Sequence, residues 1–253
     1  MMFATAVLLV LPLAQPPQAA SAQAAPARAS SAQAAPTQPP DQEARVPATP
    51  LEATPLGPYL DNLKTLRASF LQTLADPKGR EIDRATGTLV VSRPGKFSWD
   101  IHPQPLAGGG SATGGASAGA GQLMVCDGKN LWFFDRDLSQ VTVKPVDAAL
   151  SATPAMLLSG TVDVRKKFVF TDVGEREGLH WVLVEPQGAA EADFRSALFG
   201  FDHGDLKRMI LEDKLDQTAT IVFDKVARNV PVSATEVSFT PPKGADVIGT
   251  PRK

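Results

Sequence analysis

The sequence has little of the chemistry that enzymes and nucleic-acid-binding proteins use. Its 253 residues include one cysteine, Cys126, and three histidines. A single cysteine cannot form an internal disulfide, and His102, His180 and His203 have no neighbouring ligand at metal spacing. The formal net charge of −2 provides no basic stripe for DNA or RNA. We therefore expect no catalytic residues, no metal site, no cofactor and no nucleic-acid partner.

Two short motifs resemble reactive sites but have simpler explanations. The segment 115–119 has the spacing of a nucleophile elbow, yet no apolar strand precedes its serine and no helix pattern follows it. The segment 202–205 combines two aspartates with His203, but its Gly204 is typical of a tight hairpin turn. Cys126 lies in an apolar run and is predicted to be a small packed side chain rather than a nucleophile.

The chain also lacks an apolar run long enough to span a bilayer. Residues 3–14 are apolar but too few for a transmembrane helix, and Ala20-Ser21-Ala22 fits a cleavage site, so residues 1–22 are predicted to be a signal peptide. No cysteine follows to accept a lipid anchor. Residues 23–56 are rich in Ala, Pro, Gln, Ser and Thr, which predicts a disordered linker. Residues 57–253 are predicted to form one domain.

The hydrophobic spacing predicts one helix followed by many strands. A helix is predicted from Gly57-Pro58 to Asp76-Pro77, with one apolar face made by Leu60, Leu63, Leu66, Phe70, Leu71 and Leu74. From Gly87 the apolar period becomes two. The further candidate strands are 123–126, 131–134, 141–143, 168–173, 180–185, 197–201, 208–211, 220–224 and 236–239. So many strands predict an antiparallel sheet that curls into a full or partial barrel, with its concave face either filled or left as a cavity.

Residues 147–160 interrupt the strand pattern and predict a short helix. Thr153 suits the N-cap, Pro154 the first helical position and Gly160 the residue just past the end. Ala155, Met156, Leu157 and Leu158 would make this helix apolar on nearly all sides. Such a helix is suited to covering another apolar surface, and an ordinary core plug is the alternative.

A turn at Arg93-Pro94-Gly95 joins two alternating segments. Leu89 and Val91 before the turn, and Phe97, Trp99 and Ile101 after it, would share one face of a hairpin. The turn and several other motifs, in this order, resemble the LolA family of periplasmic lipoprotein carriers. The motifs are Phe70-x-Gln72, Gly87-Thr88-Leu89, Phe97-x-Trp99, Asp127-Gly128, Thr153 to Gly160, Asp213 with Gln217-Thr218, and Pro242-x-Gly244-Ala245-Asp246-Val247-Ile248.

The resemblance implies an α+β fold in which a strongly curved antiparallel sheet forms an incomplete β-barrel with a helical lid. It implies a periplasmic monomer that receives acylated lipoproteins from an inner-membrane ABC transporter and delivers them to an outer-membrane acceptor. Phe97 and its neighbours would then form the docking surface for the transporter. Arg93 would be the lid latch, and Pro154, Ala155 and Leu157 would belong to the lid. Candidate lipid-cavity residues are Phe97, Trp99, Phe133, Met156, Leu158, Phe168, Trp181 and Leu211.

Two other functions are compatible with the same sequence. The half-barrel could carry another lipid, since Phe, Leu and Met side chains do not select a head group. It could also be a sensor of lipid or lipoprotein, although no second signalling domain is evident. The Gly, Ala and Ser tract at 106–121 is predicted to be a loop insertion that the family pattern lacks.

Overall fold

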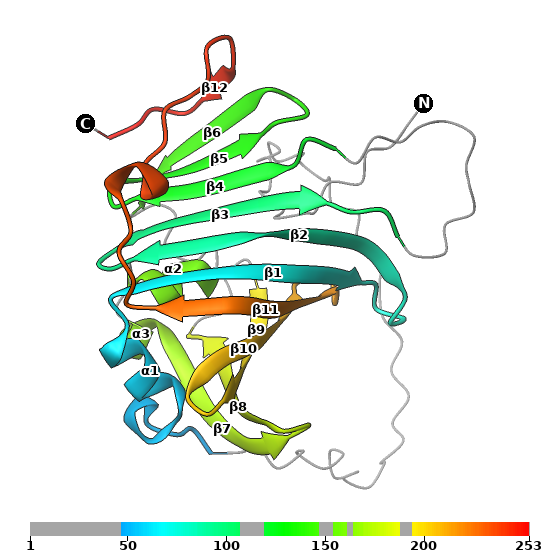
Figure 1. The fold of residues 1–253 in the computed structure, drawn as a ribbon. Helices are drawn as coiled ribbons and strands as arrows, with labels where there is room; N and C mark the ends of the chain where they lie inside the picture. Colours follow the sequence, from blue (N-terminus) through cyan, green and yellow to red (C-terminus); the bar gives the residue numbers. More distant parts are fainter. Residues whose placement is uncertain (1–46, 107–118, 147–153, 161–163, 188–193, 253) are drawn as a thin grey trace, which may run out of the picture.

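The computed structural model describes residues 47–106, 119–146, 154–160, 164–187 and 194–252. It is dominated by one twelve-stranded sheet whose order is β12-β6-β5-β4-β3-β2-β1-β11-β10-β9-β8-β7. The sheet is strongly curved and its two end strands, β7 and β12, do not meet (Figure 1). The predicted α+β half-barrel is therefore confirmed.

Eleven strands pair antiparallel, mostly as consecutive hairpins, and β12 pairs parallel with β6. Pairing of β1 with β11 joins the two halves of the chain into one sheet. The strands are β1 (Thr65–Ala75), β2 (Glu81–Ser92), β3 (Lys96–Pro103), β4 (Gln122–Asp127), β5 (Asn130–Asp135), β6 (Gln140–Pro145), β7 (Phe168–Arg176), β8 (Leu179–Pro186), β9 (Phe194–Asp202), β10 (Asp205–Asp213), β11 (Thr218–Arg228) and β12 (Asp246–Ile248).

The concave face of the sheet is covered by short helices. These are η1 (Leu51–Ala53), α1 (Leu56–Asn62), α2 (Pro154–Ser159) and α3 (Val164–Lys167). Apolar side chains from η1, α1 and α2 join those of β1 to β5 and β7 to β11 in one buried cluster. In this conformation side chains of the sheet and of these helices pack together on the concave face.

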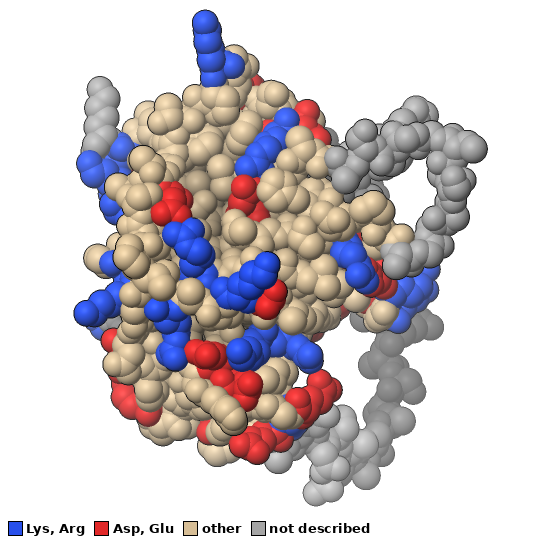
Figure 2. Space-filling model, in the orientation of Figure 1, with Lys and Arg blue, Asp and Glu red and all other residues tan. Residues whose placement is uncertain are grey.

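The C-terminal segment covers the opposite, outer face of β4 to β6. Phe239, which follows η3 (Ala234–Val237), packs beside Trp132 with ring centroids 5.6 Å apart, and Val125, Val141 and Val143 complete this smaller cluster. Figure 1 shows the segment crossing the sheet. In the same orientation, Figure 2 shows basic and acidic side chains intermingled. The ion pair of Arg67 with Glu236, 2.5 Å, ties η3 to β1 across this face.

The helix predicted from Gly57-Pro58 to Asp76-Pro77 is wrong beyond Asn62. The helix α1 ends there, and Thr65–Ala75 form β1, with Phe70 and Gln72 on the strand rather than at a helix end. Leu66, Ala68 and Phe70 are buried at alternate positions, and β1 pairs on both sides. Several of the apolar residues that are spaced for one face of a helix are also spaced for one face of a strand. Local sequence therefore fits both structures, and pairing with β2 and β11 selects the strand.

Two other predictions from the sequence are wrong at the ends of the domain. Residues 236–239 are not a strand, because η3 covers 234–237 with a capping box between Ser233 and Glu236. The linker expected up to residue 56 ends earlier: Leu51 and Leu56 are buried in the main cluster, and Thr49 N donates to Phe170 O at 2.7 Å. These two leucines supply the apolar burial that orders the segment.

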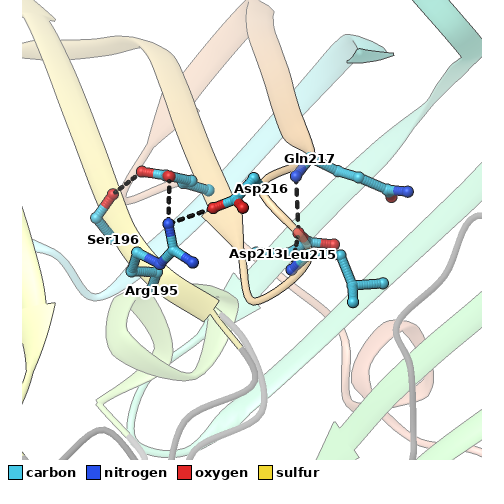
Figure 3. Close-up of polar contacts among 7 residues, drawn as sticks. Arg195, Ser196, Asp213, Leu215, Asp216 and Gln217 are labelled. Atoms are coloured by element: carbon cyan, nitrogen blue, oxygen red, sulfur yellow. Dashed lines mark hydrogen bonds and ion pairs between the residues drawn. The ribbon is translucent and has the colours of Figure 1, made fainter. Parts of the chain in front are cut away.

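The hairpin motifs are explained by their turns. Residues 202–205 form the predicted turn between β9 and β10, with His203 and Gly204 at positive φ. In the β10–β11 turn, Asp213 Oδ1 accepts from the backbone N–H groups of Leu215, 2.7 Å, and Gln217, 2.9 Å (Figure 3). The Asp213 and Gln217 motif is thus a structural turn.

Candidate functional site

The β2–β3 hairpin forms the wall on which α2 rests. Register pairs Leu89 with Trp99 and Val91 with Phe97, and all four side chains belong to the buried cluster on the concave face. This confirms the alternation predicted from the sequence. A side chain on Gly87 would clash, because a methyl group there would lie 1.9 Å from the carbonyl oxygen of Asp100 and 2.6 Å from the Phe70 ring.

Seven of the eight candidate cavity residues lie on the concave face. Phe97, Trp99, Met156, Leu158 and Phe168 are buried in the main cluster, and Phe133 and Leu211 pack against it while partly exposed. These residues come from β3, β5, β7, β10 and α2. Residues far apart in the sequence therefore meet on one apolar surface.

Trp181 is the exception, and its assignment to the cavity is wrong. Its neighbours on β8, Val182 and Val184, belong to the main cluster, as the alternation of a strand requires of every second residue. Trp181 instead packs against Gly200, whose added methyl would lie 2.9 Å from the indole ring, and its Nε1 donates to Arg176 O at 3.0 Å. The aromatic residue type predicted burial but not the face of the sheet.

The helix α2 is as apolar as its sequence predicts. Ala155, Met156, Leu157 and Leu158 are each at most 2% exposed, and Gly160 follows the helix with φ +72°. Pro154 is its first residue, whereas the predicted N-cap Thr153 lies outside the described residues. The helix rests against β2 and β3. A backbone hydrogen bond of 2.8 Å from Gly95 N to Ser159 O fastens its C-terminal end to the hairpin turn.

Arg93 lies between the C-terminal ends of α1 and α2. Its Nη1 donates to the carbonyl oxygen of Leu60 in α1, and its backbone N–H donates to Lys64 O at 2.8 Å. A methyl group on Gly160, just past α2, would lie 2.8 Å from the Arg93 Nε. Burial lowers the pKa of the guanidinium, and the nearby Asp61 carboxylate opposes that shift. The hydrogen bond is thus made to α1, while α2 contacts the other edge of the guanidinium.

Several residues of this surface were not singled out from the sequence. Phe199 and Met209 are fully buried in the cluster, as neighbours on β9 and β10. Tyr59 of α1 packs against Phe201, with ring centroids 5.2 Å apart. The period of two in 197–201 would have indicated Phe199. Tyr59 lies in α1, so the strand pattern of the sequence could not indicate that it packs against the sheet.

Comparison with known proteins identifies the family. The model of the family described as outer membrane lipoprotein carrier protein LolA matches residues 61–107 and 117–240. This chain belongs to the LolA family. The break in the match coincides with part of the Gly, Ala and Ser tract, which lies mostly outside the described residues.

Other LolA family members match most of this chain. A protein of Dechloromonas aromatica named outer-membrane lipoprotein carrier protein is 40% identical over 192 residues, covering 76% of this chain and 84% of that protein. A protein of the same name from Nitrosospira multiformis is 36% identical over 191 residues, covering 75% and 84%. A solved LolA superfamily protein from Nitrosomonas europaea is 13% identical with a TM-score of 0.39, covering 72% of this chain and 96% of that one.

The helices of the described part of the chain are too short or too polar to cross a bilayer. These short helices cover the concave face of the half-barrel, since apolar side chains of η1, α1 and α2 are buried there. The surface they cover is broad, apolar and built from many strands. Such a surface can pack against chains of hydrocarbon without selecting their length or branching.

Proposed function

We propose that this protein is a periplasmic chaperone that carries lipoproteins by covering their acyl chains with the concave face of the sheet. The observation that carries the proposal is the helix α2, whose apolar residues 155–158 are buried on that face and whose end is fastened by the β2–β3 turn. Membership of the LolA family and the names of its relatives support lipoprotein as the cargo. The protein acts by binding and release rather than by a chemical reaction.

Cargo must compete with the protein's own helices. Each buried methylene group of an acyl chain contributes about 0.8 kcal/mol, so a lipoprotein's chains need an apolar surface in water. In the closed form described above that surface is occupied by α1 and α2. Binding therefore displaces these helices, and release lets them return. A closed form of suitable stability keeps the carrier from holding its cargo too tightly.

Arg93 is proposed to be the latch that sets this balance. The contact of its guanidinium with the Leu60 carbonyl and its proximity to Gly160 place it at the two helix ends that would have to move. A guanidinium can donate to several carbonyl groups at once, so one side chain can stabilise both helices. Loss of this contact would weaken the closed form and favour the loaded one.

The partners are proposed to be an inner-membrane ABC transporter that supplies the lipoprotein and an outer-membrane acceptor that takes it. Phe97, expected from the family resemblance to form the docking surface, is fully buried in the closed form. It can contact a transporter only after the covering helices move. Docking and opening would then be coupled, which would restrict loading to the membrane that holds the transporter.

The proposed organisation of the chain fits this route. A signal peptide at residues 1–22 would direct export to the periplasm, and the Ala- and Pro-rich stretch after it would separate the export signal from the folded part. The carrier domain then begins near Thr49, where backbone pairing with β7 starts, rather than at residue 57.

The proposal is tested with the purified protein and a synthetic triacylated lipopeptide. Gel filtration should show the lipopeptide co-eluting with the protein as a soluble complex. A diacylated phospholipid and a free fatty acid serve as comparisons. If the phospholipid or the fatty acid co-eluted with the protein and the lipopeptide did not, the half-barrel would carry another lipid. If none of the three co-eluted with the protein, the carrier function would be contradicted.

A further inference from the structure

Two polar side-chain atoms buried in the concave cluster have no hydrogen-bond partner in the part of the chain that the structure describes. They are the Trp99 Nε1 and the Tyr59 hydroxyl, and they are the only such atoms among the described residues. Both residues belong to the cluster covered by the helices, Trp99 on β3 and Tyr59 on α1. Native proteins leave few buried donors unpaired, because each one forfeits its hydrogen bond to water. Two on one candidate binding surface call for a common cause.

The residues that contact or pair with Trp99 are apolar. Its ring stands nearly perpendicular to that of Phe70, with centroids 5.7 Å apart, and it pairs with Leu89 and Met124 on the adjacent strands. An aromatic face is at best a weak acceptor for the indole N–H. By contrast, the other two tryptophans of the chain are satisfied: Trp132 donates to Asp127 at 2.7 Å and Trp181 to Arg176 O.

Tyr59 resembles Trp99 in this respect. Its ring packs against Phe201 and lies 5.4 Å from the Arg228 guanidinium carbon, yet its hydroxyl accepts from and donates to no described residue. Burial raises the pKa of this hydroxyl, so it stays protonated and able to donate. An indole N–H can only donate, and a phenol can donate as well. An acceptor is therefore the one kind of partner that would satisfy both atoms.

We propose that Trp99 and Tyr59 donate hydrogen bonds to the ester carbonyl groups at the head of the bound acyl chains. This inference rests on the proposed carrier function. An ester carbonyl is bonded directly to the hydrocarbon of its acyl chain, so it is the polar group that comes nearest to an apolar site with the chain, and it brings an acceptor. The two donors thus cost the empty protein stability and are satisfied when cargo lies between the displaced α1, which carries Tyr59, and the sheet, which carries Trp99. They give the otherwise unselective wall a preference for acyl chains over plain hydrocarbon.

The test compares ester and ether ligands. One probe is a synthetic lipopeptide whose cysteine sulfur carries a glyceryl group through a thioether. Two palmitoyl chains are esterified to the glyceryl group, and a third is attached to the cysteine nitrogen as an amide. The second probe replaces both esters by alkyl ethers. Dissociation constants are measured for the wild-type protein and for Tyr59→Phe and Trp99→Phe. The control is Trp181→Phe, on the other face of the sheet, whose indole is already satisfied. The free energy of unfolding of each empty variant is measured in urea.

Each satisfied donor should be worth about a fivefold preference for the ester probe. The expected result is that the wild type prefers the ester, that Y59F and W99F each lose part of the preference, and that W181F keeps it. Empty Y59F should be at least as stable as the wild type, since the variant removes an unpaired buried hydroxyl. A purely structural tyrosine would instead lose stability with no change in the ester preference.

Three outcomes separate the claims. Equal binding of ester and ether probes by the wild type would overturn the carbonyl inference and leave the carrier function standing. Failure of the wild type to bind either probe would overturn the carrier function and the inference with it. A diester phosphatidylethanolamine that shows the same dependence on Tyr59 and Trp99 would support carbonyl recognition and show that it extends to phospholipids.

Discussion

Replacing Arg93 by leucine should make the carrier retain its cargo. The substitution removes the charged donor to the Leu60 carbonyl at the end of α1 and the guanidinium packed against Gly160. A hydrogen bond from a charged group contributes about 1.5 to 3 kcal/mol. We take the lower end, about 1.5 kcal/mol, because the guanidinium is partly exposed.

The substitution acts on the closed, empty form, which competes with the lipid for the concave face. Weakening that form by about 1.5 kcal/mol should raise the apparent affinity for lipopeptide about tenfold. Uptake should persist, and transfer of bound lipopeptide to acceptor vesicles should slow. The assay measures both the dissociation constant and the rate of transfer. Arg67→Leu is the control, because Arg67 lies on the outer face and pairs with Glu236. Unchanged affinity and transfer in R93L would refute the latch.

Two further predictions concern stability. Gly160→Ala should lower the free energy of unfolding by more than Gly178→Ala: both residues have positive φ, but only at Gly160 would the methyl group meet Arg93. Equal losses in urea denaturation would show that this contact is unimportant. Hydrogen bonds from Arg67 and Ser233 lower the pKa of Glu236 to about 2, so its stabilising effect is full above about pH 4.5 and is lost as the pH falls towards 2. Glu236→Gln should flatten the dependence of the unfolding midpoint on pH over that window, and an unaltered pH profile would contradict the assignment.

The fold class and most strands could be predicted from the sequence because their apolar period and turn residues agree. The β2–β3 hairpin is an example: alternating residues and Arg93-Pro94-Gly95 point to one register, and the structure has it. The strand β1 could not be recognised, since Leu66 and Phe70 fit a helical as well as a strand pattern and only pairing with β2 and β11 separates the two. Long-range pairing leaves no local mark in the sequence.

Residue type predicted which residues of the candidate site are buried, but not which face of the sheet or which helix end they contact. Residue type placed Phe97, Met156 and Leu158 in the interior, and the apolar helix α2 was recognised as a cover. The face occupied by Trp181 depends on the register of β8, and an error of one residue reverses it. The position of Arg93 beside the ends of both α1 and α2 depends on how two distant helix ends meet, and no local sequence pattern predicts that meeting.

The most direct test of the carrier function starts from membranes. Vesicles containing a radiolabelled triacylated lipoprotein and its energised ABC transporter are incubated with the purified protein and then sedimented. If the protein is a lipoprotein carrier, label should appear in the supernatant as a one-to-one complex with the protein, and its release should require both energy and the protein. Label that stays in the membrane pellet, although the transporter releases lipoprotein to an established carrier, would contradict it.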